Sequence, residues 1–177
     1  MTIAPAKLLV FAHDRLVCIK IIGRANVGAS IDFKRLVTEL MEKDLTCFVL
    51  DLSECLLMDS TFLGVLAGFG LRISTPQNGH ATARSIELLN PNVRVSELLE
   101  NLGVAHLFQA SQRQAEALES VAGSEAAPGA EPTREEVKRN CLEAHQILME
   151  VCPENTARFK DVAAFLTEDL KKIRAAS

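Results

Sequence analysis

The chain has 177 residues, of which 48% are hydrophobic, and a formal net charge of −4. Its length is enough for one ordinary domain with an extension, and its apolar content is enough for a real core. The charge is evenly spread without a basic stripe, which argues against direct nucleic-acid binding. The apolar stretch at residues 62–71 is too short to span a bilayer, and the N-terminus lacks the long apolar segment of a signal peptide. We therefore expect a cytoplasmic protein with no membrane span.

Residues that could carry catalysis or bind a cofactor are scattered. The five cysteines lack C-x-x-C spacing, and the four histidines stand in separate segments. These patterns argue against a disulfide framework and against a zinc site. Gly68-Phe69-Gly70 is only a fragment of a nucleotide-binding motif, and it lies inside an apolar run. The sequence predicts no catalytic residue, no metal and no cofactor, and so a protein that is not an enzyme.

The first half of the chain alternates strand-like and helix-like segments. Residues 7–12 and 15–22 are rich in Val, Ile, Leu and Phe around a short turn, which predicts a β-hairpin. After a loop at residues 23–29, Ser30 is the predicted cap of a helix. Residues 46–52 form a nearly unbroken apolar run, which is typical of a strand covered on both faces.

The pattern continues beyond residue 60. It predicts, in order, a helix at 62–71, a loop at 74–80, a strand at 84–89, a helix at 93–101, a strand at 106–109 and a helix at 112–121. The order ββαβαβαβα within about 120 residues predicts an α/β fold with a mixed β-sheet packed by helices.

The composition changes at residues 123–132, which are small, polar and contain Pro and Gly. We interpret this stretch as a linker. Residues 133–177 then predict an α-helical hairpin, with Thr133 capping the first helix and Pro153 ending it. Two amphipathic helices bury little surface alone, so their apolar faces must meet the preceding domain, a second copy or another protein.

The most informative segment is Asp59-Ser60-Thr61, which follows a strand and begins a helix. If Asp59 is the N-cap, Met58 and Leu63 form a hydrophobic staple, and Ser60 is left free at the first helical position. If Ser60 is the cap, its hydroxyl is used by the backbone and the staple is lost. The staple favours Asp59. Routine capping remains the alternative, because the spacing alone does not prove a phosphorylation site.

Three glycines interrupt the predicted helix after this segment. Each of Gly64, Gly68 and Gly70 weakens a helix by up to roughly 1 kcal/mol relative to alanine. Their presence predicts a close backbone approach to the sheet, although three glycines also fit a simple packing need.

Two separated motifs resemble the STAS domain family, in particular the bacterial anti-sigma factor antagonists. The first is Asp51-Leu52-Ser53 with Met58-Asp59-Ser60-Thr61 and Leu63-Gly64-Val65-Leu66, and the second is Leu88-Leu89-Asn90-Pro91-Asn92-Val93 with Leu98-Leu99 and Asn101-Leu102-Gly103-Val104. The resemblance covers residues 5–120. It implies a STAS-like domain at residues 1–122, a linker at 123–132 and a helical extension at 133–177.

The resemblance also implies a function in a partner-switching pathway. In that family an anti-sigma factor that is itself a serine kinase phosphorylates the serine after the aspartate, which is Ser60 here. The unmodified antagonist binds the anti-sigma factor, and a PP2C-type phosphatase resets the phosphorylated form. Asp51, Asp59 and Thr61 match neighbouring motif positions and are the candidates for supporting the phosphoacceptor loop.

Met58 and Phe62, which flank the motif, are the candidates for partner contact. Phe62 departs from many antagonists, which have glycine at that position, and its ring could crowd a docking kinase. The alternative function is a non-phosphorylated STAS scaffold or assembly module. Such a module would use its C-terminal helices for homodimerisation or for docking a partner.

Overall fold

The computed structural model describes residues 6–45, 47–74, 86–113, 123–127 and 129–176. The sheet has the strand order β6-β5-β3-β2-β1-β7, and β4 pairs separately with β2. β1 pairs antiparallel with β2 and β7, whereas the β2–β3, β3–β5, β5–β6 and β2–β4 pairs are parallel. The strands are β1 (Lys7–His13), β2 (Leu16–Ala25), β3 (Cys47–Asp51), β4 (Cys55–Met58), β5 (Ile86–Leu89), β6 (Phe108–Ser111) and β7 (Ser124–Glu125). The predicted mixed sheet is confirmed.

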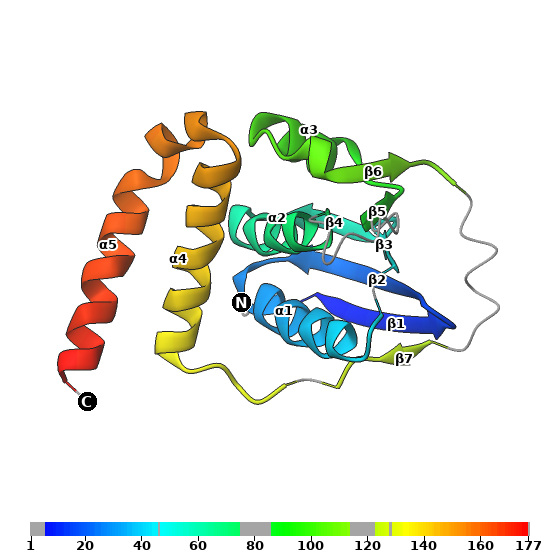
Figure 1. Ribbon diagram of the computed structural model, residues 1–177, viewed down its shortest axis with the longest axis horizontal. Coiled ribbons are helices and arrows are strands. Elements are labelled where there is room, and N and C mark those ends of the chain that lie inside the picture. Colours follow the sequence, from blue (N-terminus) through cyan, green and yellow to red (C-terminus); the bar gives the residue numbers. More distant parts are fainter. Residues whose placement is uncertain (1–5, 46, 75–85, 114–122, 128, 177) are drawn as a thin grey trace.

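The helices connect and cover these strands (Figure 1). The α-helices are α1 (Val27–Glu42), α2 (Ser60–Ser74), α3 (Val93–Asn101), α4 (Arg134–Val151) and α5 (Thr156–Ala175), with 3-10 turns at η1 (Ala105–Leu107) and η3 (Pro153–Asn155). α1 and α2 pack against each other, and the rings of Phe33 and Phe62 lie 5.0 Å apart between them. The predicted α/β architecture with a C-terminal helical hairpin is therefore present.

One boundary and one strand in the first half differ from the prediction. α1 begins at Val27, because the Asn26 side chain accepts a hydrogen bond from the Ala29 amide at 3.1 Å and acts as the cap. The expected cap, Ser30, lies inside the helix and donates to the Val27 carbonyl at 2.6 Å. The strand β4 was not predicted, because its four residues follow an acidic turn and pair only with the end of β2.

The segment predicted as a linker begins with structure. Ser124 and Glu125 form β7 and pair with Val10 and Leu9 at the edge of the sheet. The β-strand pairing therefore extends past the predicted end of the domain at residue 122. Residues 114–121 of the helix expected at 112–121 lie outside the described residues.

The C-terminal hairpin packs on its own domain, one of the three arrangements that the sequence left open. α4 lies against α2 and touches α1, whereas α5 is the outermost helix and packs on α4 (Figure 1). Ala144 and Leu148 of α4 are fully buried and belong to the same hydrophobic core as the domain. Within the part of the chain that the structure describes, no helix is both long enough and apolar enough to cross a membrane.

Candidate functional site

The turn from β4 into α2 determines how Ser60 is presented. The Asp59 amide donates to the Ala25 carbonyl at 3.0 Å, and the Asp59 carboxylate accepts from the Phe62 amide at 2.8 Å. Asp59 is therefore the N-cap and Ser60 the first helical residue. Met58 and Leu63 are both buried, as the hydrophobic staple requires. The predicted assignment of the cap to Asp59 is confirmed.

The Ser60 hydroxyl is half-buried and is not free. Its Oγ lies 3.0 Å from Nε2 of His145 on α4, and His145 Nδ1 lies 2.8 Å from the Cys141 carbonyl oxygen. Because a carbonyl only accepts, Nδ1 carries the proton and donates to it. In the neutral imidazole, Nε2 then accepts from the Ser60 hydroxyl. The extension therefore supplies a partner for the hydroxyl that the sequence predicted to be unengaged.

Burial and hydrogen bonding shift the pKa values of three groups around Ser60. Burial raises the pKa of Asp59, although backbone amide donors including those of Phe62 and Thr61 partly offset it. Burial would lower the pKa of His145, but hydrogen bonds to Cys141 and the charges of Cys141 and Asp59 outweigh it and raise this pKa. The hydrogen bond to His145 lowers the pKa of the Cys141 thiol. Ser60 therefore contacts His145, whose pKa is coupled to that of Cys141, and it follows the capping carboxylate of Asp59.

The contact between α2 and α4 continues along both helices. The Thr61 Oγ1 atom lies 3.5 Å from the Cys141 sulfur. A Cβ atom added at Gly64 would lie 2.4 Å from the Ala144 carbonyl oxygen and 2.7 Å from the Ala144 Cβ. The prediction of a close backbone approach is met at Gly64, but the approaching element is α4 and not the sheet.

The other predicted site residues lie away from the Ser60 hydroxyl. Asp51 is buried and accepts from the Ser53 amide at 2.9 Å, so it supports the turn between β3 and β4. Phe62 is fully buried against Phe33, and Met58 is also buried. Met58 is 7% exposed and Phe62 is not exposed, so neither side chain is presented at the surface in this structure, and their contact with a partner stays a prediction. The Phe62 ring fills the core and does not crowd the approach to Ser60.

Sequence reasoning missed the residues that the structure brings to this site from elsewhere. His145 and Cys141 are separated from Ser60 and Thr61 by 85 and 80 positions. The only local signal was their spacing of four, which places both on one face of a helix.

Leu56 and Val93 are 62% and 72% exposed, and the Asn92 side chain holds α3 to the Leu56 carbonyl at 3.3 Å. These two exposed apolar side chains lie on neighbouring elements.

A metal centre is not formed by the residues described. Among them, no group of three or more His, Cys, Asp or Glu side chains is arranged to hold a metal ion.

Comparison with known proteins gives the family. Residues 8–117 match the model of the STAS domain, which is more than half of the chain. The chain therefore belongs to the STAS domain family. No curated protein matches it by sequence.

Two solved structures show the same fold. The anti-sigma factor antagonist SpoIIAA in its unphosphorylated form aligns with a TM-score of 0.52 and 18% identity, over 64% of this chain and 94% of that one. The Thermotoga maritima protein TM1081 aligns with a TM-score of 0.52 and 23% identity, over 63% and 92% of the two chains. At these identities the likeness establishes the fold alone. Both alignments cover about two thirds of this chain, as expected if the C-terminal helices are an addition to the shared domain.

Proposed function

We propose that this protein is an anti-sigma factor antagonist of a cytoplasmic partner-switching pathway, and that phosphorylation of Ser60 switches it. Its partner is an anti-sigma factor with serine kinase activity. A PP2C-type phosphatase removes the phosphate. The protein serves as substrate and binding partner, with no catalytic residue of its own.

The observation that carries this proposal is that Asp59, and not Ser60, caps the start of α2. Asp59 makes the capping hydrogen bond to the Phe62 amide at 2.8 Å, so the Ser60 hydroxyl is not needed by the helix backbone. A phosphate on that hydroxyl would lie at the positive end of α2, within reach of backbone amides. The cap and the core side chain Phe62 would stay in place. Modification can therefore change the surface without unfolding the domain.

A contact surface for the partner lies beside this helix start. Leu56 is on β4, the strand that leads into Ser60, and Val93 begins α3. Both side chains are exposed, and the Asn92 side chain bonds to the Cys55 carbonyl at 2.7 Å and so holds the two elements together. An exposed apolar pair on rigid elements is suited to protein contact. It takes the role that the sequence assigned to Met58 and Phe62.

The test is phosphorylation of the full chain by the anti-sigma factor kinase of the same genome, with labelled ATP. We expect label in the wild type and none in Ser60→Ala. The matched control is Ser53→Ala, which removes an exposed hydroxyl from the turn between β3 and β4 and should be labelled like the wild type. Equal labelling of wild type and Ser60→Ala would show that Ser60 is not the acceptor.

The alternative, a non-phosphorylated STAS scaffold that associates through its C-terminal helices, is supported by one feature of α5. Phe165 lies on this outermost helix and is 64% exposed. Light scattering of wild type and Phe165→Ser distinguishes the two functions. A dimer that dissociates in the variant would favour the scaffold, whereas a monomer in both would remove it.

A further inference from the structure

We propose that α4 and the anti-sigma factor compete for one face of α2, so that the extension controls access to Ser60. In the structure α4 occupies the surface at which a kinase must reach the serine. The partner binds only when α4 has left that surface. This inference rests on the proposed function and adds an intramolecular competitor to it.

The first support is the cover over the serine itself. The Ser60 Oγ atom lies 3.0 Å from the ring of His145, which is 5% exposed. Thr61, the next residue, is 6% exposed and touches the Cys141 sulfur. Phosphoryl transfer needs the acceptor oxygen in line with the γ-phosphate inside the kinase active site. An oxygen that faces the buried side chains of α4 cannot take that position.

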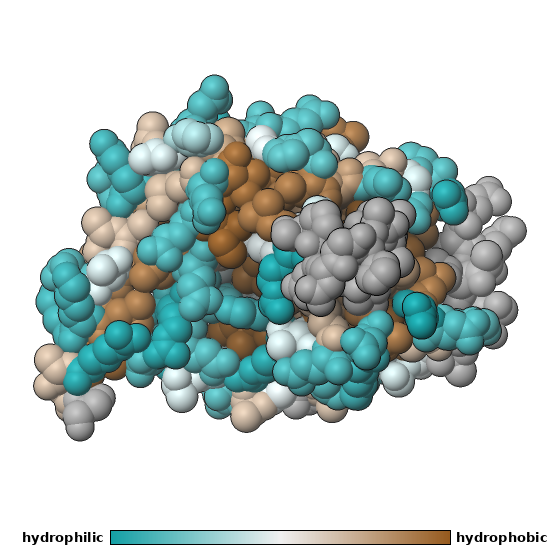
Figure 2. Space-filling view, viewed as in Figure 1, coloured by the Kyte–Doolittle hydropathy of each residue, from teal (hydrophilic) through white to brown (hydrophobic). Residues whose placement is uncertain are grey.

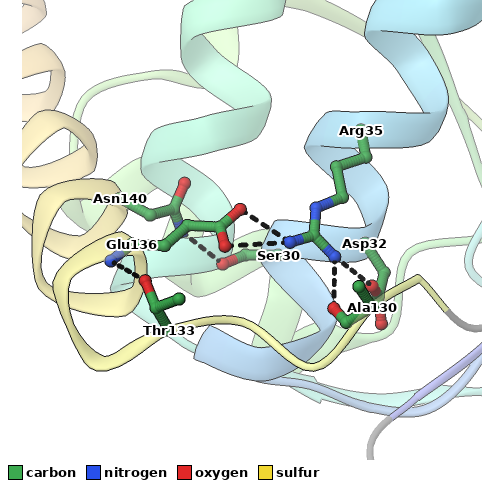
Figure 3. Close-up of polar contacts among 7 residues, drawn as sticks. All are labelled: Ser30, Asp32, Arg35, Ala130, Thr133, Glu136 and Asn140. Atoms are coloured by element: carbon green, nitrogen blue, oxygen red, sulfur yellow. Dashed lines mark hydrogen bonds and ion pairs between the residues drawn. The ribbon is translucent and has the colours of Figure 1, made fainter.

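The second support is that α4 is tied to α1 by polar side chains, in addition to its apolar contact with α2 (Figure 3). The Asn140 amide donates to Ser30 Oγ at 2.9 Å, and the Arg35 guanidinium binds both oxygens of Glu136 at 2.7 and 2.9 Å. Lys34 pairs with Glu143 at 2.6 Å. The Arg35 pair and the Lys34 pair are each more than one third exposed, so water can replace these contacts when α4 leaves.

The third support is that the packing between α4 and the domain is incomplete. The Asn140 Oδ1 atom is buried and has no hydrogen-bond partner among the described residues. A surface pocket of about 280 Å³, open to solvent, lies where α1, α2 and α4 meet and is lined by Lys34, Gly68 and Ile147 among others. Figure 2 shows this face hollowed beside α4, with hydrophobic residues gathered over the neighbouring elements. The edge of this interface, at Asn140 and the pocket, is thus less completely packed than its centre at Ala144 and Leu148, which are fully buried.

Gly64 provides a test that leaves the domain intact. The three atoms nearest to an added Cβ at this position all belong to Ala144, and two of them are backbone atoms at 2.4 and 2.7 Å. Gly64→Ala therefore clashes with docked α4, whereas alanine is the better residue within α2 itself. Gly68→Ala is the matched control on the same helix. Its Cβ would meet only the end of the flexible Ile147 side chain, at 2.8 Å.

Two measurements on the full chain read out the result. Hydrogen exchange reports whether α4 is docked, and labelling by the anti-sigma factor kinase reports access to Ser60. We expect Gly64→Ala to exchange faster within α4, with unchanged protection in β2 and β3, and to be phosphorylated on the order of tenfold faster than wild type. Gly68→Ala should behave like wild type in both measurements.

The outcomes separate this inference from the proposed function. If Gly64→Ala shows faster exchange in α4 and is labelled at the wild-type rate, the competition is wrong and phosphorylation stands. If α4 is released and none of the three proteins is labelled, both are wrong. If exchange in α4 is unchanged in Gly64→Ala, the close contact at Ala144 does not hold the extension, and the inference is overturned.

Discussion

Asp59 has two roles at the start of α2, because it caps the helix and places a charge beside Ser60. It caps α2 through the Phe62 amide at 2.8 Å, and it lies partly buried next to the serine and to His145. The cap needs an oxygen acceptor, which an amide side chain also provides. The negative charge is a separate property of the site. It raises the pKa of His145, and burial of the Asp59 carboxylate disfavours its charged form.

Replacing Asp59 separates its capping role from its charge. Asp59→Ala leaves the Phe62 amide without its acceptor and should lower the free energy of unfolding by about 1 kcal/mol. Asp59→Asn keeps an acceptor oxygen at the cap and should stay close to wild type. Urea unfolding followed by circular dichroism measures both. Similar losses in the two variants would mean that the charge, and not the cap, stabilises this helix.

The charge itself predicts a dependence on pH. Burial raises the folded-state pKa of Asp59 above its ordinary value of 3.8. A raised pKa means that the folded protein binds more protons than the unfolded chain. The stability that protonated Asp59 contributes is therefore fully present below pH 3.8 and is lost as the pH rises through the folded-state pKa.

Comparing wild type with Asp59→Asn removes this titration. Because the charge of Asp59 also raises the pKa of His145, the comparison is read in the acidic range, below the ordinary His145 pKa of 6.5. The free energy of unfolding of wild type minus that of the variant should be largest below pH 3.8 and should decline toward neutral pH. Urea unfolding over a series of pH values gives the difference. A difference that stays constant, or grows with pH, would contradict the pKa direction at Asp59.

At the scale of elements, the helical hairpin is tied to the domain at its bend as well as along α4. Asn155 is 1% exposed, and its amide donates to the carbonyls of Leu102 and Leu148, each at 2.9 Å. Leu102 ends α3 and Leu148 is in the last turns of α4, so one side chain joins three parts of the chain. This contact ties the bend of the hairpin to the domain while α4 is docked.

Removing this amide should loosen the hairpin at its bend. Asn155→Ala removes the donor to the Leu102 carbonyl, whereas the Leu148 carbonyl still accepts from the Cys152 amide at 3.1 Å. The loss should cost about 1–3 kcal/mol in the free energy of unfolding. Thr156→Ala, at an exposed neighbouring position, is the control and should change little. Denaturant unfolding compares the two. An Asn155→Ala protein as stable as the control would show that solvent replaces both hydrogen bonds.

The helices also show which features of the fold could be predicted from the sequence. Periodicity predicted α2, α3, α4 and α5 because each has a sustained apolar face or clear end signals. It misplaced the start of α1, since Asn26 and Ser30 are both good caps and only the packing selects between them. Nothing local to Ser60 could predict its contact with His145, which depends on how a helix 85 positions away docks. The Asp59-Ser60-Thr61 motif could be found from the sequence, whereas the docking of α4 over it could not.

At the scale of the whole molecule, the STAS domain presents two surfaces on neighbouring elements. One is the Ser60 face of α2, which α4 covers, and the other carries the exposed side chains of Leu56 and Val93. A partner that uses both surfaces would gain apolar contact from one and reach Ser60, the proposed phosphoacceptor, through the other. Only the first requires the extension to move.

Leu56→Ser tests the open surface. The side chain is 62% exposed, so the fold should keep its stability, while binding to the anti-sigma factor should weaken on the order of tenfold. Leu16→Ser removes a leucine that is 41% exposed on β2 and serves as the control. Calorimetric titration measures both affinities. Equal weakening by the two variants would argue against a specific contact at Leu56.

The central claim is that Ser60 becomes available only when α4 leaves α2, and a reversible cross-link tests it most directly. Thr61 Oγ1 lies 3.5 Å from the Cys141 sulfur, so Thr61→Cys places two thiols where a disulfide can join α2 to α4. Peptide mapping confirms the cross-link, and wild type under the same redox conditions is the control. We predict that the anti-sigma factor kinase labels the reduced Thr61→Cys protein at Ser60 and does not label the oxidised one. Equal labelling of the two forms, whether both accept phosphate or neither does, would contradict the account.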